Sequence, residues 1–188
     1  MTKVITEVTW PLYLHIKNSG CVEAITDYSD FERGYAYNFL RKCSGKENFF
    51  FGMQAETDAQ LKSGRYHANT YAPNQQLVLL HLEIPYGELY KCAFYDFDDL
   101  IYQSGIRPGE YPELQAEDEH RIKNSILTDG YDDDAIQVIY DRIEASWIVD
   151  IERRGVRDWI NDDEETFQAS EALLWARVAA DMHRESFL

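Results

Sequence analysis

The stretch QLVLLHLEIP, residues 76–85, decides the fold class. Its apolar side chains run from Leu77 to Ile84 with only His81 and Glu83 between them, and Pro85 ends the run because proline cannot continue a central strand. Such continuous apolarity, rather than strict alternation, predicts a strand that is buried on both faces. We therefore expect a β-sheet with this strand in its interior.

Shorter elements surround this strand in the first half of the chain. Two further strands are predicted at 48–54 (NFFFGMQ) and 89–95 (LYKCAFY), where aromatic and apolar side chains dominate. Residues 55–64 predict one or two helical turns, and residues 66–75 predict a loop. The first half thus combines a small sheet with helices.

Two helices are predicted before the central strand. The first, WPLYLHIKNSG at 10–20, accepts Pro11 in its first turn and ends at Gly20. The second, at 29–45, has an apolar stripe, basic residues near its end, and Gly45 as its stop.

The second half predicts helices almost throughout. The predicted helices are 98–105, 115–127, 132–155 and 163–184. The longest, 132–155, repeats large apolar side chains at three- and four-residue spacing, begins with aspartates and ends with arginines. We therefore predict an α+β fold in which a small β-sheet with N-terminal helices is followed by a helical, acidic C-terminal half packed on it.

The whole chain, 1–188, is predicted to be a single domain, since no linker or repeat divides it. Acidic residues number 34 and basic residues 18, which gives a net charge of −16. Residues 1–95 are nearly neutral, whereas 96–165 hold 21 acidic and 7 basic residues, a net charge of −14. Such a field repels phosphate backbones and attracts basic partners, although solubility alone also accounts for acidic surfaces. We expect no direct nucleic-acid binding.

Clustered carboxylates raise the question of a metal site. Asp96-Phe-Asp-Asp and the aspartates at 129–134 lack the order of a calcium loop, so helix capping by Asp98 or Asp99 is the favoured interpretation. His81-x-Glu83 resembles half of a zinc-deaminase motif but lacks the downstream cysteine pair. The sequence predicts no metal and no cofactor.

Signatures of enzymes and of export are missing from the sequence. It has no phosphate-binding glycine loop and no nucleophile elbow. It also has no run of about 18 apolar residues, no signal peptide and no closely spaced cysteines, which predicts a cytoplasmic protein without a membrane partner. Whether it is an enzyme stays undecided, with a non-enzymatic protein favoured.

Several pieces together resemble an uncharacterised bacterial and phage family, one of the domains of unknown function. They are the strand LVLLHLEIP, the following FYDFDD, and EASW at 144–147. The resemblance implies no activity. The opening LYLHIKNSGCVEAI, 12–25, also resembles the first strand and helix of ADP-ribosyltransferase folds, in which a histidine or arginine and a later glutamate contact NAD.

Two hypotheses follow. The first is an acidic, non-enzymatic interaction protein that binds a basic or nucleic-acid-binding protein, for example a phage or mobile-element inhibitor of host defence acting as a nucleic-acid mimic; homo-oligomers are left open. Its predicted partner-binding residues are Asp98, Asp99, Glu117, Asp118, Glu119, Asp132, Asp133, Asp134, Asp141 and Glu144. The second is a small toxin-like or transferase-type enzyme with a nucleotide pocket beside strand 77–84. Its candidate residues are His15, Arg65, His67, Tyr71 and Glu83.

Overall fold

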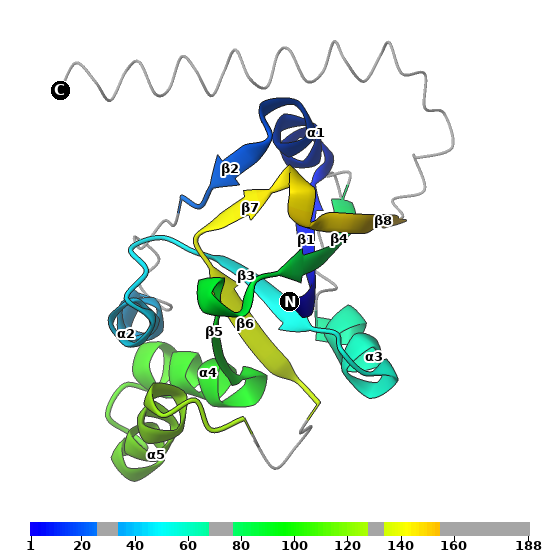
Figure 1. The fold of residues 1–188 in the computed structure, drawn as a ribbon. Helices are drawn as coiled ribbons and strands as arrows, with labels where there is room; N and C mark the ends of the chain where they lie inside the picture. Colours follow the sequence, from blue (N-terminus) through cyan, green and yellow to red (C-terminus); the bar gives the residue numbers. More distant parts are fainter. Residues whose placement is uncertain (26–33, 68–76, 128–133, 155–188) are drawn as a thin grey trace, which may run out of the picture.

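The computed structural model describes residues 1–25, 34–67, 77–127 and 134–154. These residues form a six-stranded antiparallel sheet in the order β5-β6-β3-β1-β4-β8, a two-stranded sheet of β2 and β7, and five α-helices (Figure 1). The strands are β1 (Thr2–Thr9), β2 (Cys21–Glu23), β3 (Phe50–Gln54), β4 (Leu77–Ile84), β5 (Tyr90–Ala93), β6 (Ile136–Tyr140), β7 (Arg142–Glu144) and β8 (Ile148–Arg154). The helices are α1 (Trp10–Ser19), α2 (Gly34–Ser44), α3 (Asp58–His67), α4 (Phe94–Ile101) and α5 (Pro112–Lys123). The mixture of helices and sheet confirms the α+β class.

The predicted central strand is confirmed as β4. It pairs with β1 along its whole length, from Thr2 opposite Ile84 to Thr9 opposite Leu77, and with β8 on its other side. Val78 and Leu80 belong to the core on one face of the sheet and Leu79 to the core on the other, so β4 is buried on both faces as its apolar run predicts.

The helix predicted at 10–20 is also confirmed, and so is the described part of the helix predicted at 29–45, whose first residues, 29–33, lie outside the described residues. Thr9 caps α1 by accepting a hydrogen bond from the backbone of Leu12, Pro11 lies in the first turn, and Gly20 ends the helix with a φ of 87°. Gly45, with a φ of 70°, follows α2 in the same way. Glycine suits both positions because other residues are strained in the left-handed region.

The prediction of a helix at 132–155 is wrong. Its described part forms strand β6, strand β7, a short 3₁₀ turn (Ala145–Trp147) and strand β8. All five residues of β6 are buried because β6 lies between β3 and β5 inside the sheet. Burial of every side chain suits a strand covered on both faces, and the isoleucines and valines favour strand over helix. The described part of the second half is therefore not a helical layer, because three of its segments belong to the sheets, and the helix predicted at 163–184 lies outside the described residues.

Three smaller predictions need correction. First, α3 is longer than predicted and carries Arg65 and His67 in its last turn, outside any loop. Second, α4 begins at Phe94 with no side-chain cap, so neither Asp98 nor Asp99 caps it, and it continues into a π-helical turn (Tyr102–Ile106). Third, α5 begins earlier than predicted and ends at Lys123.

The helices cover opposite faces of the six-stranded sheet. On one face, Ile16 of α1 packs with Val4, Val8 and Leu80 in the largest core cluster. On the other face, α2, α4 and α5 pack together over β5 and β6, while α3 packs over β1 and β3 (Figure 1). This second face therefore has two separate core clusters, and the larger of two hollows in the described structure lies between them.

Candidate functional site

Three polar side chains from distant parts of the chain meet at the β4–β8 edge of the sheet. The Nε2 of His81 lies 2.6 Å from Oε1 of Glu152, and the guanidinium of Arg65 donates to the same oxygen at 2.5 Å. Burial raises the pKa of Glu152, but the hydrogen bonds from Arg65 and His81 outweigh it and lower this pKa below its ordinary value. Glu152 therefore stays ionised and fixes the His81 ring.

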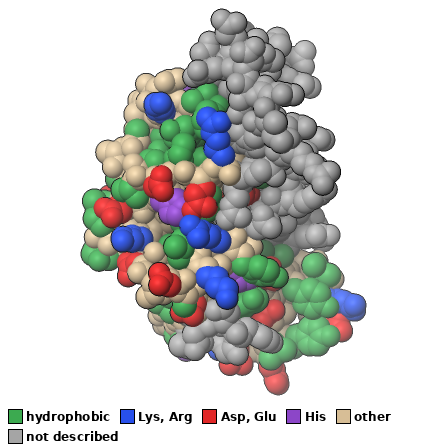
Figure 2. Space-filling view, turned by 90° about the vertical axis from the view of Figure 1, so that its right-hand side faces the viewer, with side chains coloured by type: hydrophobic (Ala, Val, Ile, Leu, Met, Phe, Trp, Pro, Cys, Tyr) green, Lys and Arg blue, Asp and Glu red, His purple; other side chains and the backbone are tan. Residues whose placement is uncertain are grey.

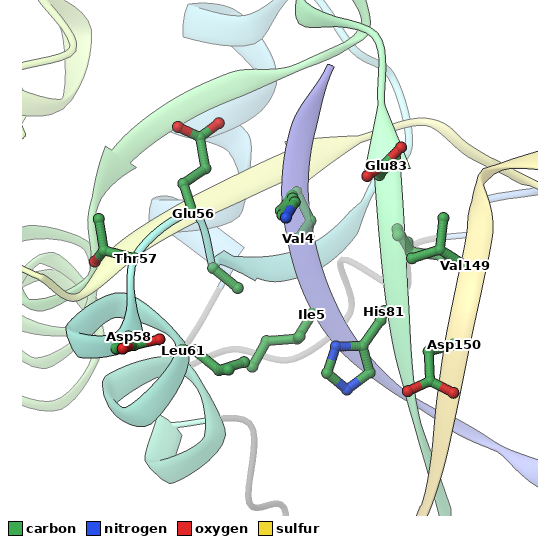
Figure 3. Close-up of a pocket in the computed structure, with 13 residues that line it drawn as sticks. Val4, Ile5, Glu56, Thr57, Asp58, Leu61, His81, Glu83, Val149 and Asp150 are labelled. Atoms are coloured by element: carbon green, nitrogen blue, oxygen red, sulfur yellow. The ribbon is translucent and has the colours of Figure 1, made fainter.

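A hollow of about 290 Å³ lies beside this group, between β1, β4, β8 and the start of α3. Figure 3 shows His81 and Asp150 side by side on neighbouring strands, with Glu83 further along β4 and Asp58 and Leu61 across the hollow. A histidine held by a carboxylate is suited to proton transfer. Among the described lining residues, however, the only hydroxyl is that of Thr57, which accepts a hydrogen bond from the backbone of Gln60 and so caps α3.

A metal centre receives no support from this geometry. In the described part of the chain no three histidine, cysteine or carboxylate side chains gather closely enough to hold a metal ion.

On the face that carries α3 and β8, positively and negatively charged side chains are interspersed, as the coloured atoms of Figure 2 show. The hollow at His81 is therefore a polar depression without a recognised reaction.

The residues of the enzyme hypothesis do not form one site. Arg65 and Glu83 lie near the His81 hollow, but His67 lies against Phe94 in a second hollow, with the two rings tilted and their centroids 4.2 Å apart. His15 lies on α1, the helix that covers the opposite face of the sheet. Tyr71 lies outside the described residues. Residues 12–19 are helical and 21–23 form the strand, the reverse of the strand and helix that the ADP-ribosyltransferase resemblance implies.

The predicted partner-binding residues separate into two groups with different surroundings. Asp141 and Glu144, at the β6–β7 corner, are neutralised by cations. Arg142 donates to Glu144 at 2.9 Å and to Glu88 at 3.0 Å, and Lys46 lies 3.3 Å from Asp141. This corner therefore offers little net negative charge to a partner. Asp134 is half-buried, and Asp132 and Asp133 lie outside the described residues.

The second group lies on α4 and α5, and its less exposed carboxylates already accept hydrogen bonds from neighbouring side chains. Asp118 accepts a hydrogen bond from Gln103 at 2.8 Å, and Glu119 accepts one from the hydroxyl of Tyr35 at 2.7 Å. Asp99 is half-buried and close enough to raise the pKa of Asp118.

The exposed carboxylates on α4 and α5 have no such hydrogen bonds in the described structure. Asp98, Glu113 and Glu117 are exposed, and within the described residues their carboxylates take part in no hydrogen bond or ion pair. We call these three residues the acidic face. Sequence reasoning found Asp98 and Glu117 but omitted Glu113, because it placed Glu113 before the helix; Pro112, a residue typical of the first helical turn, was the available signal.

One further pairing was missed from the sequence. Asp96 is only 4% exposed, and the Nε of Arg121 lies 3.0 Å from its carboxylate. The sequence motif around Asp96 first suggests metal binding or capping, but the structure gives this aspartate a structural role that joins α4 to α5. Nothing in the local spacing predicts the partner, which is 25 residues away in the chain.

Asp118 makes stability depend on pH. Burial, with a smaller contribution from Asp96 and Asp99, raises its pKa from 3.8 to about 6 despite the hydrogen bond from Gln103. Between these values the folded chain binds more protons than the unfolded chain, so stability falls as pH rises through this window. Asp118→Asn is expected to raise the free energy of unfolding at pH 7 by about 1 kcal/mol, a figure reduced for solvent screening, and by nothing near pH 4. Urea unfolding at both pH values tests this; an equal effect at both would contradict it.

Comparisons with known proteins add no relative. No family model matches the chain, and no curated protein or solved structure matches it. Among the described residues, no helix is long and apolar enough to cross a membrane.

Proposed function

We propose that this protein is a non-enzymatic interaction protein that binds a basic protein through the acidic face on α4 and α5. The observation that carries the proposal is the contrast between the two acidic groups. The β6–β7 corner is neutralised by Arg142 and Lys46, whereas the carboxylates of Asp98, Glu113 and Glu117 make no hydrogen bond or ion pair among the described residues, and only Glu117 has a cation, Arg121, near enough to attract it. Their field is thus directed at solvent and attracts a cationic surface.

Apolar side chains beside these carboxylates also support a binding surface. Leu114 is 52% exposed and Ile106 50%, and Tyr102 and Tyr111 are exposed as well. Of the whole of α5, only Ile122 is buried. Aromatic and aliphatic side chains surrounded by charge are typical of protein interfaces, where the apolar groups supply affinity and the charges supply orientation. Nucleic-acid-binding proteins present basic surfaces, so they are the expected class of partner.

A short lysine- and arginine-rich peptide is a suitable probe, with its affinity for the full chain measured by fluorescence anisotropy. The double variant Glu113→Lys/Glu117→Lys is expected to weaken binding by at least about tenfold. The matched control is Glu23→Lys/Glu56→Lys, which makes the same change of net charge at two exposed positions on β2 and before α3. The control should lose less than about threefold, because distant charges are screened.

Salt provides the second arm of the test. Raising the ionic strength from about 50 to 300 mM is expected to weaken the wild-type complex strongly and to remove most of the difference between the two double variants. If both double variants weaken binding equally, or if salt has no effect, net charge or apolar contact explains the binding and the acidic face is not the site.

A further inference from the structure

A second hollow, of about 560 Å³, lies on the sheet face between the two core clusters that α3 and α4 cover. Its floor includes Met53 and Gln137 of the sheet, and its sides include Phe97 of α4 and His67 of α3. This volume falls within the range of small-ligand pockets. It is the larger of the two hollows described here.

Aromatic rings form much of its lining. Tyr37 and Phe97 are stacked with centroids 5.9 Å apart and an interplanar angle of 9°, and Phe51 lies against both at 5.5 Å. His67 and Phe94 close the α3 side. Ring faces attract cations and planar groups, and this attraction grows where water is excluded.

Apart from His67, the polar side chains in the hollow are acidic or neutral. Glu7 lies on β1 and Asp98 on α4, and no lysine or arginine is among the described lining residues. Gln137 is only 4% exposed, and its side-chain amide has no hydrogen-bond partner in the described part of the chain. Because Gln137 lines the hollow, its amide offers one acceptor oxygen and two N–H donors to a ligand that enters it.

We propose that this hollow binds the guanidinium of an arginine side chain on the basic partner, an inference that rests on the proposed function. A guanidinium is planar and stacks on aromatic rings, and its N–H groups match the carboxylate of Asp98 and the amide oxygen of Gln137. Lysine fits less well, because its ammonium is strongly hydrated and does not stack.

The hollow is continuous with the acidic face. Asp98 belongs to both, and Ile101 and Ile106 line the hollow at the end of α4 and in the π-helical turn that follows. The chain then runs through exposed Tyr111 into the start of α5, which carries Glu113. A partner bound to the acidic face would therefore have the hollow within reach of a long side chain.

The test compares three short peptides that differ at one position: arginine, lysine, or citrulline, which is the neutral analogue of arginine. Affinities for the full chain are measured by calorimetry. The arginine peptide is expected to bind at least about tenfold more tightly than the citrulline peptide and several-fold more tightly than the lysine peptide. The side-chain NH₂ resonances of Gln137 should shift in nuclear magnetic resonance spectra with the arginine peptide only.

Two variants locate the binding. Asp98→Asn, an exposed change that leaves the fold intact, is expected to weaken the arginine peptide about tenfold. Asp58→Asn, the same chemical change at an exposed position outside this hollow, is the control and should leave the affinity within about twofold. Equal effects of the two variants, or equal binding of arginine and citrulline, would overturn the inference.

Free L-arginine separates a protein side chain from a small molecule. It is expected to bind at least about tenfold more weakly than the peptide, and equal affinity would overturn the assignment to a partner protein. If Gln137 does not respond while Glu113→Lys/Glu117→Lys still abolishes binding of the basic peptide, this inference fails and the proposed function remains.

Discussion

Arg121→Met is expected to lower the free energy of unfolding by about 3 kcal/mol. The substitution removes the cation whose Nε lies 3.0 Å from the Asp96 carboxylate, and Asp96 is only 4% exposed. A buried charge without its partner keeps its desolvation cost and loses the attraction that offset it. Urea unfolding at pH 7 measures the loss, and α4 and α5, which the pair joins, should be the first helices to open.

Two companion variants isolate burial as the cause. Arg41→Met removes an arginine of similar shape from the exposed pair with Glu47, and it is expected to cost less than about 0.5 kcal/mol. Replacing both partners, in Asp96→Leu/Arg121→Met, should restore stability to within about 1 kcal/mol of the wild type, because the buried carboxylate is removed together with its cation. Equal losses for the two arginine substitutions would show that the buried aspartate does not need its partner.

Gly52→Ala is expected to destabilise the protein by about 3 kcal/mol, at the upper end of overpacking effects. A methyl group at this position of β3 would lie 2.6 Å from Cγ1 of Val4, 3.0 Å from the backbone oxygen of Ile5 and 3.3 Å from a ring carbon of Tyr140. Val4 and Tyr140 are fully buried, so neither has room to move, and the backbone oxygen belongs to the adjacent strand.

The matched control is Gly87→Ala, in the short turn after β4. No heavy atom lies within 4 Å of the added methyl there, and the backbone does not have a positive φ. Its effect on the free energy of unfolding should stay within about 0.5 kcal/mol, and a slight gain is expected because alanine restricts the unfolded chain. A comparable loss in both variants would mean that glycine flexibility, rather than close strand contact, sets the requirement at Gly52.

Sequence reasoning located the acidic half of the chain but not which of its carboxylates are paired with cations in the folded protein. In the sequence Asp141 and Glu144 are acidic residues like Glu117. In the structure, however, Lys46 neutralises Asp141 and Arg142 neutralises Glu144. Arg142 is only two positions from Glu144, but the geometry that makes this cation bond to Glu144 and also to Glu88, 54 positions away, exists only in the folded chain. The hollow at Gln137 was likewise outside the reach of sequence reasoning, because its lining comes from three α-helices, one π-helical turn and three strands.

Local patterns determined the elements that depend on neighbouring residues. Pro11 and Gly20 mark the ends of α1, Gly45 marks the end of α2, and the apolar run of β4 predicts an interior strand. These features act over a few residues and need no knowledge of the rest of the chain.

Tertiary structure alone decided the conformation of residues 134–154. Their apolar side chains fit a helical spacing as well as a buried strand, so periodicity did not distinguish the two. The decision lies in pairing: β6 bonds to β3 and β5, and β8 bonds to β4, which together satisfy the backbone groups of these segments and bury Val138 and Ile139 on opposite faces. A strand is stable only where such neighbours exist, and those neighbours are set by the whole fold.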